Sequence, residues 1–118
     1  MNANPKTFTL YLLIILLVLL TNISFGQITI TQFNAGWNST NDVSWLKKLT
    51  DVDKIKYIDI AENTKAQNKY EIVVVPTIIV FYEGEEVKRF QADISFAMKA
   101  TKEDVQEVID EIMMENSY

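Results

Sequence analysis

A continuous apolar run, IVVVPTIIVF at residues 72–81, constrains the fold of this 118-residue chain more than any other stretch. Residues 78–81 are all β-branched or aromatic, which is typical of a strand buried on both faces. Pro76 cannot donate to a sheet, so it is expected to start that strand. The YEGEE segment around Gly84 predicts a hairpin turn, after which residues 86–92 return as a more polar strand. The chain is therefore expected to contain a sheet with an antiparallel pair.

Two more strands and two short helices are predicted upstream of that run. Residues 28–35 (ITITQFNA) alternate apolar and polar side chains at first, as an outer or first strand does, and residues 54–60 (KIKYIDI) alternate as well. A short helix is expected over residues 41–50, with Val43 and Leu46 on one side and Trp45 and Leu49 as further candidates for that side. A second is expected over residues 62–70, where capping residues precede helix formers.

The segment at residues 101–114 has the clearest helical pattern. Thr101 and Asp104 are spaced like a capping box, with Asp in place of Glu. Five apolar side chains then follow the i, i+3, i+4, i+7, i+8 spacing of an amphipathic helix: Val105, Val108, Ile109, Ile112 and Met113. The predicted order is β-α-β-α-β-β-α, an α/β fold in which helices flank a mixed central sheet.

Residues 1–26 are predicted to be a signal peptide that is removed from the domain. One positive charge precedes the apolar run LYLLIILLVLL at residues 10–20, and the small residues Ser24 and Gly26 are spaced like a cleavage site. Residues 27–118 are then a single exported domain, periplasmic or secreted.

An uncleaved membrane anchor through residues 8–25 is the alternative interpretation of this leader. That stretch is slightly shorter than the roughly 20 apolar residues that a spanning helix needs, and polar residues interrupt it. The protein would contact a membrane only if the leader stays in place.

Composition excludes several classes of function. The sequence has no cysteine and no histidine, so disulfides, a lipid-modified cysteine, zinc or haem ligation and classical triads are not available to it. Its formal net charge of −5 argues against nucleic acid as a partner, because binding to nucleic acid phosphates requires a patch of Lys and Arg. The acids at residues 51–53 and 83–86 lack the spacing of a calcium loop. No cofactor and no metal are therefore predicted.

The turn QFNAGWNSTND, residues 32–42, reads as the end of a buried strand that runs into a helix start, which is a usual location for a reactive group. Residues 38–41 are all good N-cap residues, and Asp42 suits the positive end of a helix, so one interpretation is that the turn caps a helix. The other is that the same polar groups hydrogen-bond a bound ligand or peptide.

Three segments, taken in their order along the chain, resemble the thioredoxin family. They are FNAGW at residues 33–37, KYEIVVVPTIIVF at residues 69–81, and EGEEV at residues 83–87, the last followed by an amphipathic helix. The resemblance covers residues 28–115 and lacks the family's usual additional N-terminal strand and helix. It implies a thioredoxin-like fold.

The family's active-site tryptophan is followed by Cys-x-x-Cys, and the matching positions here are Asn38 and Asn41. Disulfide exchange needs a thiolate to attack and a second thiol to resolve the mixed disulfide, and an amide does neither. Gln32 stands where the family often keeps a buried acid for proton transfer. The resemblance therefore implies a redox-inactive domain that is not an enzyme.

The family's peptide-binding side is matched in this sequence. The resemblance implies that Pro76 follows a cis bond beside the active-site turn, and that the backbone of the residue before it pairs with extended peptides. The alternative is that Pro76 only starts a buried strand behind core valines. The candidate peptide-binding residues are Trp37, Val74, Val75, Pro76 and Ala92.

The leading hypothesis is an exported, redox-inactive thioredoxin-like module that binds a protein or peptide of the cell envelope near Trp37 and Pro76. One alternative is a structural or assembly protein that dimerises through a sheet edge or a patch at Phe96. Another is an enzyme related to thiol-disulfide oxidoreductases that uses other chemistry or a partner's thiols. For the segment at residues 95–100, Phe96 and Met98 are expected either to form a second exposed patch or to enter the core.

Overall fold

The protein is described by a computed structural model that covers residues 5–21 and 26–117. Four strands form one sheet in the order β2-β1-β3-β4; β1 and β2 are parallel, and β3 is antiparallel to both of its neighbours. This confirms the predicted mixed sheet. The elements are α1 (Pro5–Thr21), β1 (Ile28–Asn34), the 3-10 helices η1 (Gly36–Asn41) and η2 (Leu46–Lys48), β2 (Lys54–Asp59), α2 (Thr64–Lys69), β3 (Thr77–Tyr82), β4 (Glu85–Gln91) and α3 (Lys102–Glu115).

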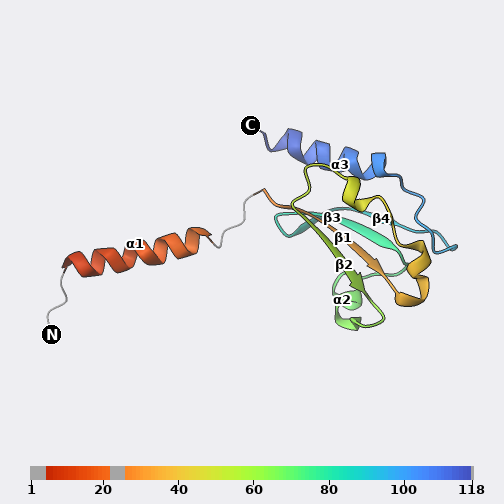
Figure 1. The fold of residues 1–118 in the computed structure, drawn as a ribbon, viewed down its shortest axis with the longest axis horizontal. Coiled ribbons are helices and arrows are strands. Elements are labelled where there is room, and N and C mark those ends of the chain that lie inside the picture. The colour runs from red at the N-terminus through yellow and green to blue at the C-terminus, as the bar shows by residue number, and fades with distance from the viewer. Residues whose placement is uncertain (1–4, 22–25, 118) are drawn as a thin grey trace.

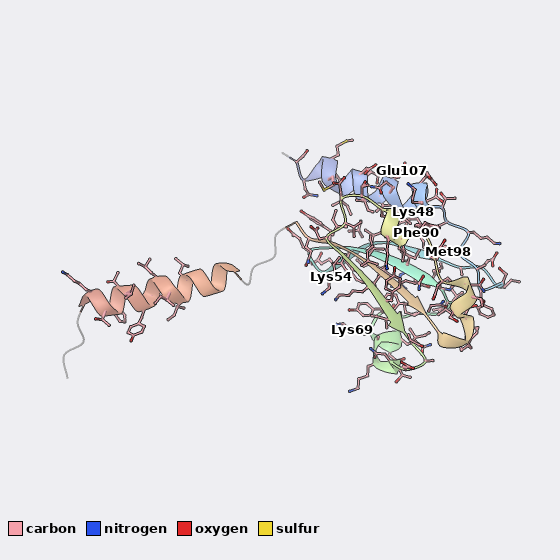
Figure 2. All side chains as sticks on the ribbon, in the orientation of Figure 1. Lys48, Lys54, Lys69, Phe90, Met98 and Glu107 are labelled. Atoms are coloured by element: carbon pink, nitrogen blue, oxygen red, sulfur yellow. The ribbon has the colours of Figure 1, made fainter. Side chains whose placement is uncertain are left out.

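The sheet separates two apolar cores, with α3 on one face and α2 on the other (Figure 1). The larger core joins the inward side chains of α3 to one face of β1 and β3, and Figure 2 shows Phe90 and Met98 on this side. The smaller core lies on the α2 face and is built from Phe33, Ile72, Val75 and Ile79. Both clusters draw only on residues between 28 and 112, so α1 contributes to neither.

Strand β1 lies in the centre of the sheet, between β2 and β3; of the two alternatives, an outer or a first strand, it is the first strand in chain order and not an outer one. Six of its seven residues are buried. The alternation that suggested an outer strand comes from Thr29 and Thr31, and Thr31 is only 2% exposed although its side chain is polar.

The predicted helix over residues 41–50 is not an α-helix. The chain instead makes the short 3-10 helices η1 and η2, with Asp42 in an extended conformation between them (φ −55°, ψ 138°). The N–H of Val43, which would be one of the unpaired first-turn donors of the predicted helix, donates to Oε1 of Gln32 at 2.7 Å. The expected burial holds nonetheless, because Val43, Leu46 and Leu49 all join the larger core.

The remaining elements confirm the sequence predictions closely. Asn63 caps α2 by accepting from the N–H of Ala66 at 3.0 Å. The β3–β4 hairpin turns through Glu83 and Gly84, both with positive φ, of 53° and 84°. Glycine adopts a positive φ without steric penalty because it has no Cβ.

Thr101 and Asp104 form the predicted capping box of α3, in which each side chain accepts from the other residue's backbone N–H. Val105, Ile109 and Ile112 are buried as expected. Met113 is 45% exposed, so the apolar stripe ends one residue earlier than predicted.

The structure describes only part of the predicted leader. Residues 5–21 form α1, whereas Ser24 of the predicted cleavage site lies outside the described residues. Among the residues that are described, none of the helices has the length and apolar character needed to cross a membrane.

Thr101→Ala should lower the free energy of unfolding by about 1 kcal/mol, because it removes the side-chain acceptor of the capping box. Thr50→Ala is the matched control, since Thr50 is exposed and only its backbone groups make the hydrogen bonds found for it. Urea unfolding of the two variants measures the difference; equal stabilities would show that the box does not stabilise α3.

Candidate functional site

Three segments distant in sequence meet at the carboxyl end of β1. They are the turn over residues 35–42, the loop that precedes β3, and the loop over residues 92–101. The N–H of Ala92 donates to the carbonyl of Pro76 at 3.0 Å, and Nδ2 of Asn38 donates to the carbonyl of Phe96 at 3.0 Å. The Val75–Pro76 peptide bond is cis. The candidate residues of all three segments are thus brought to one end of the sheet.

Asn38 is the centre of this arrangement and is only 4% exposed. Its Nδ2 also donates to Oδ1 of Asn34 at 3.0 Å, while its Oδ1 accepts from Nδ2 of Asn41 at 2.8 Å. Its backbone carbonyl accepts from Nδ2 of Asn34 at 3.1 Å. One amide side chain therefore ties the turn both to β1 and to the loop that carries Phe96.

The network continues inward through Gln32 and Asp42. Oδ1 of Asp42 accepts from Nε2 of Gln32 at 3.0 Å and from Nδ2 of Asn34 at 2.6 Å. In the described residues, no fully buried side-chain nitrogen or oxygen lacks a hydrogen-bond partner. A polar network that is satisfied in this way rigidifies its surroundings, because every alternative arrangement leaves a buried group unpaired.

The helix-cap interpretation of this turn is contradicted. The residue before η1 is Ala35, and no side chain caps the helix. Asn38 lies inside η1 with a non-helical backbone (φ −112°, ψ 19°), and its amide bonds to other side chains and to a distant carbonyl. Its side chain therefore anchors the turn rather than starting a helix.

The chemistry available at this turn is limited by its residue types. Amides offer neither a nucleophile nor a redox couple, and the chain contains no cysteine. The turn itself cannot carry thiol–disulfide exchange.

An exposed aromatic pair lies beside the network. The ring centroids of Trp37 and Phe96 are 5.2 Å apart and their planes are perpendicular, the edge-to-face geometry that aromatic rings favour. Trp37 is 67% exposed and Phe96 42% exposed. Phe96 has a φ of 60°, a left-handed conformation, and this residue's carbonyl is the one that Asn38 holds.

A shallow groove of about 330 Å³ continues from Phe96 toward the proline loop. Its lining includes two of the predicted residues, Val74 and Ala92, together with Asp93, Ile94 and Phe96. Ile94 is 97% exposed, which is unusual for a side chain of this size and leaves an apolar rim.

One charged group marks the rim of the groove. The hydroxyl and N–H of Ser95 both donate to Oδ1 of Asp93, and the hydroxyl contact is the main cause that holds the pKa of Asp93 below its ordinary value. Nζ of Lys99 lies 3.7 Å from the other carboxylate oxygen. Asp93 is therefore ionised at neutral pH and places a negative charge beside an apolar surface.

Val75 has a backbone with unused hydrogen-bonding groups. Neither its N–H nor its C=O has a hydrogen-bond partner within residues 5–21 and 26–117, although the residue is only 4% exposed. Backbone groups in such positions are normally paired. The neighbouring Val73 is 86% exposed, so the interpretation of residues 73–75 as core holds for Val75 but is wrong for Val73.

Two rim residues, Asp93 and Ile94, were not predicted as site residues. The only signal for Ile94 was a large apolar side chain between the polar residues Asp93 and Ser95. Of the two apolar residues in the segment 95–100, each alternative holds for one: Phe96 is exposed, whereas Met98 packs against the larger core.

Comparison with solved structures identifies the fold. Thioredoxin 1 of Thermosipho africanus TCF52B is 22% identical, matching 76% of this chain and 99% of its own with a TM-score of 0.60. A mutant thioredoxin of Halobacterium salinarum NRC-1 is 20% identical, matching 74% and 75% of the two chains with a TM-score of 0.60. Fasciola hepatica thioredoxin is 25% identical, matching 80% and 89% with a TM-score of 0.54. No family model and no curated protein matches the sequence.

The chain therefore has a thioredoxin-like α/β fold. The Cys-x-x-Cys motif is absent, since the chain has no cysteine at all.

Asn38→Ala should lower the free energy of unfolding by about 2–4 kcal/mol, because it leaves buried polar groups of Asn34 and Asn41 and the carbonyl of Phe96 without a partner. Ser39→Ala, one residue away and exposed, should change stability by less than about 0.5 kcal/mol. Urea unfolding followed by tryptophan fluorescence measures both. A small effect of Asn38→Ala would mean that water replaces the lost bonds.

Proposed function

We propose that this protein is a non-catalytic, exported binding module that holds an extended segment of a protein or peptide of the cell envelope. The segment lies between the Trp37–Phe96 pair and the loop before β3. The observation that carries the proposal is the combination of the unpaired Val75 backbone with an exposed apolar rim on either side of it.

The backbone of Val75 supports strand addition. An extended peptide that lies alongside residues 73–75 would take the N–H and C=O of Val75 as partners, as an added strand does in other peptide-binding domains. Main-chain hydrogen bonds of this kind give affinity without demanding a particular sequence.

The rim supplies the selectivity. Trp37, Phe96 and Ile94 offer apolar and aromatic surface that is exposed in the free protein, and aromatic side chains are enriched where binding energy concentrates. Asp93 is ionised, and its pair with Lys99 is exposed and long, at 3.7 Å, so its carboxylate stays available to the peptide and favours a basic residue next to an apolar one.

Export rests on the leader. The apolar run at residues 10–20, preceded by one positive charge, has the composition of a signal peptide, and the small residues Ser24 and Gly26 suit cleavage before Gln27.

A structural role through dimerisation is the alternative. The strands β2 and β4 are at the two edges of the sheet, and Phe96 is partly exposed, so either surface is available to a second copy. Sedimentation velocity of the wild type and of Phe96→Ser separates the two functions. A wild-type dimer that Phe96→Ser converts to a monomer would favour assembly, whereas a monomer in both favours the binding module.

Trp37→Ala should weaken the binding of extended peptides at least about tenfold, since it removes the largest exposed aromatic surface of the rim. The measurement is fluorescence anisotropy of labelled ten-residue peptides that alternate apolar and basic residues, titrated with the full chain. Met114→Ala is the control, because Met114 is equally exposed, at 67%, but lies on α3. Equal affinities of Trp37→Ala and wild type, or no binding by any peptide, would contradict the proposal.

The full chain should give no rate above buffer in an insulin-reduction assay with dithiothreitol, because neither a thiolate nor a resolving thiol is present. Measurable turnover would overturn the non-catalytic assignment. The control is a thioredoxin with both cysteines, assayed at the same concentration.

A further inference from the structure

The α2 face of the sheet is covered at one end only. The smaller core and the turn that follows α2 cover Phe33 and Ile58, but toward the beginning of β1 the face opens into a cavity of about 190 Å³. No helical residue of the described chain lines this cavity, and it shares no residue with the groove at Phe96. Its principal lining residues are Thr29, Thr31, Phe33, Lys56, Tyr70 and Phe81.

One side of this cavity is polar, and its groups are fixed by strand register. Thr31 of β1 is paired directly with Lys56 of β2, so their side chains stand next to each other on the same face. Thr31 is 2% exposed, and its hydroxyl makes no hydrogen bond with any described residue. Because no fully buried side-chain oxygen in the described chain lacks a partner, the small exposed area of Thr31 must include this hydroxyl, which reaches into the cavity.

The charge at that side is positive and uncompensated. Lys56 makes no ion pair with a described residue, and Lys54 stands beside Thr29 on the same face. Two acids of the β3–β4 hairpin have partners of their own: Glu86 is bound by Arg89 at 2.6 Å, and Glu83 accepts from the N–H of Gly26 at 3.2 Å. In a protein of net charge −5, this is a local site for an anion.

The other side of the cavity is aromatic. The ring of Tyr70 lies 5.2 Å from that of Phe33 and 5.6 Å from that of Phe81, measured between centroids. The three rings form a continuous wall that suits a flat or short apolar body. The volume is below the roughly 300–1,000 Å³ of sites for drug-sized ligands, so the occupant is a fragment-sized molecule.

We propose that this cavity binds a small organic carboxylate with an aromatic or short apolar body. The carboxylate accepts from the ammonium of Lys56 and the hydroxyl of Thr31, and the body packs against Tyr70, Phe33 and Phe81. Charge-assisted hydrogen bonds of this kind are about twice as strong as neutral ones, so the anion is preferred over a neutral molecule of the same shape.

Benzoate is the probe, and the measurement is a ¹⁵N–¹H titration of the full chain. Benzoate should saturate and shift the amide signals of residues 29–33, Lys56 and Phe81, and should bind at least about fivefold tighter than the neutral benzamide. Benzylamine should bind more weakly than both. Equal affinities for the three probes would overturn the proposal, and so would shifts centred on Val74 and Phe96.

Two variants assign the polar contacts. Lys56→Met, which keeps a long side chain at an exposed position, should weaken benzoate binding about tenfold, and Thr31→Val, which keeps the shape and removes the hydroxyl, about two- to tenfold. Lys48→Met is the control, because Lys48 is exposed and lies on the α3 side of the sheet in Figure 2; its affinity should equal that of the wild type. Equal losses in Lys48→Met and Lys56→Met would reveal non-specific charge attraction and defeat the proposal.

A second copy of the chain is the competing occupant of this face. Dilution of the ligand-free protein tests it, since dissociation of a dimer would shift the same amide signals without benzoate. Signals that stay constant on dilution support the small carboxylate, and signals that move with protein concentration overturn it.

Discussion

The architecture of the site depends on one buried amide. Asn38 donates to β1 through Asn34 and to the carbonyl of Phe96, two groups that no stretch of regular secondary structure connects. An amide can do this because it carries two donors and an acceptor on one planar group. A cysteine at the same position would offer one weak donor and could not hold the two segments together. In this protein the turn therefore has a mechanical role, since it sets where the loop over residues 92–101 and its aromatic side chain lie.

The strands and α3 could be predicted from the sequence because their signals are local. The run at residues 78–81 and the capping box with its apolar stripe each specify one element without reference to distant residues. The helix predicted over residues 41–50 failed because its local signal is ambiguous. Val43, Leu46 and Leu49 are spaced by three, which is the repeat of a 3-10 helix as well as an acceptable spacing in an α-helix. The N–H of Val43 bonds to Gln32 of β1, a long-range contact that the local pattern does not contain.

The site residues also differ in whether they could be predicted from the sequence. Trp37, Val74, Pro76 and Ala92 could be named as candidates because the segments around Trp37 and Pro76 resemble those of thioredoxins. The position of Phe96 could not be predicted. It depends on a hydrogen bond between residues 58 positions apart and on a left-handed backbone conformation, and neither has a signal in the sequence pattern. A phenylalanine in a loop of mixed polar and apolar residues is compatible with core or surface, and here the nearby Met98 packs against the core instead.

The two faces of the sheet solve the same problem in different ways. A sheet face must be covered by another layer or be made polar. The face toward α3 carries the larger core. The opposite face is covered at one end by the α2 region, and at the other it presents threonines from β1 and lysines from β2, which tolerate water. Short threonine side chains beside three large rings leave a hollow, and unpaired lysines beside it set the sign of the charge. The cavity thus follows from the residues that stand on the α2 face where no helix covers it.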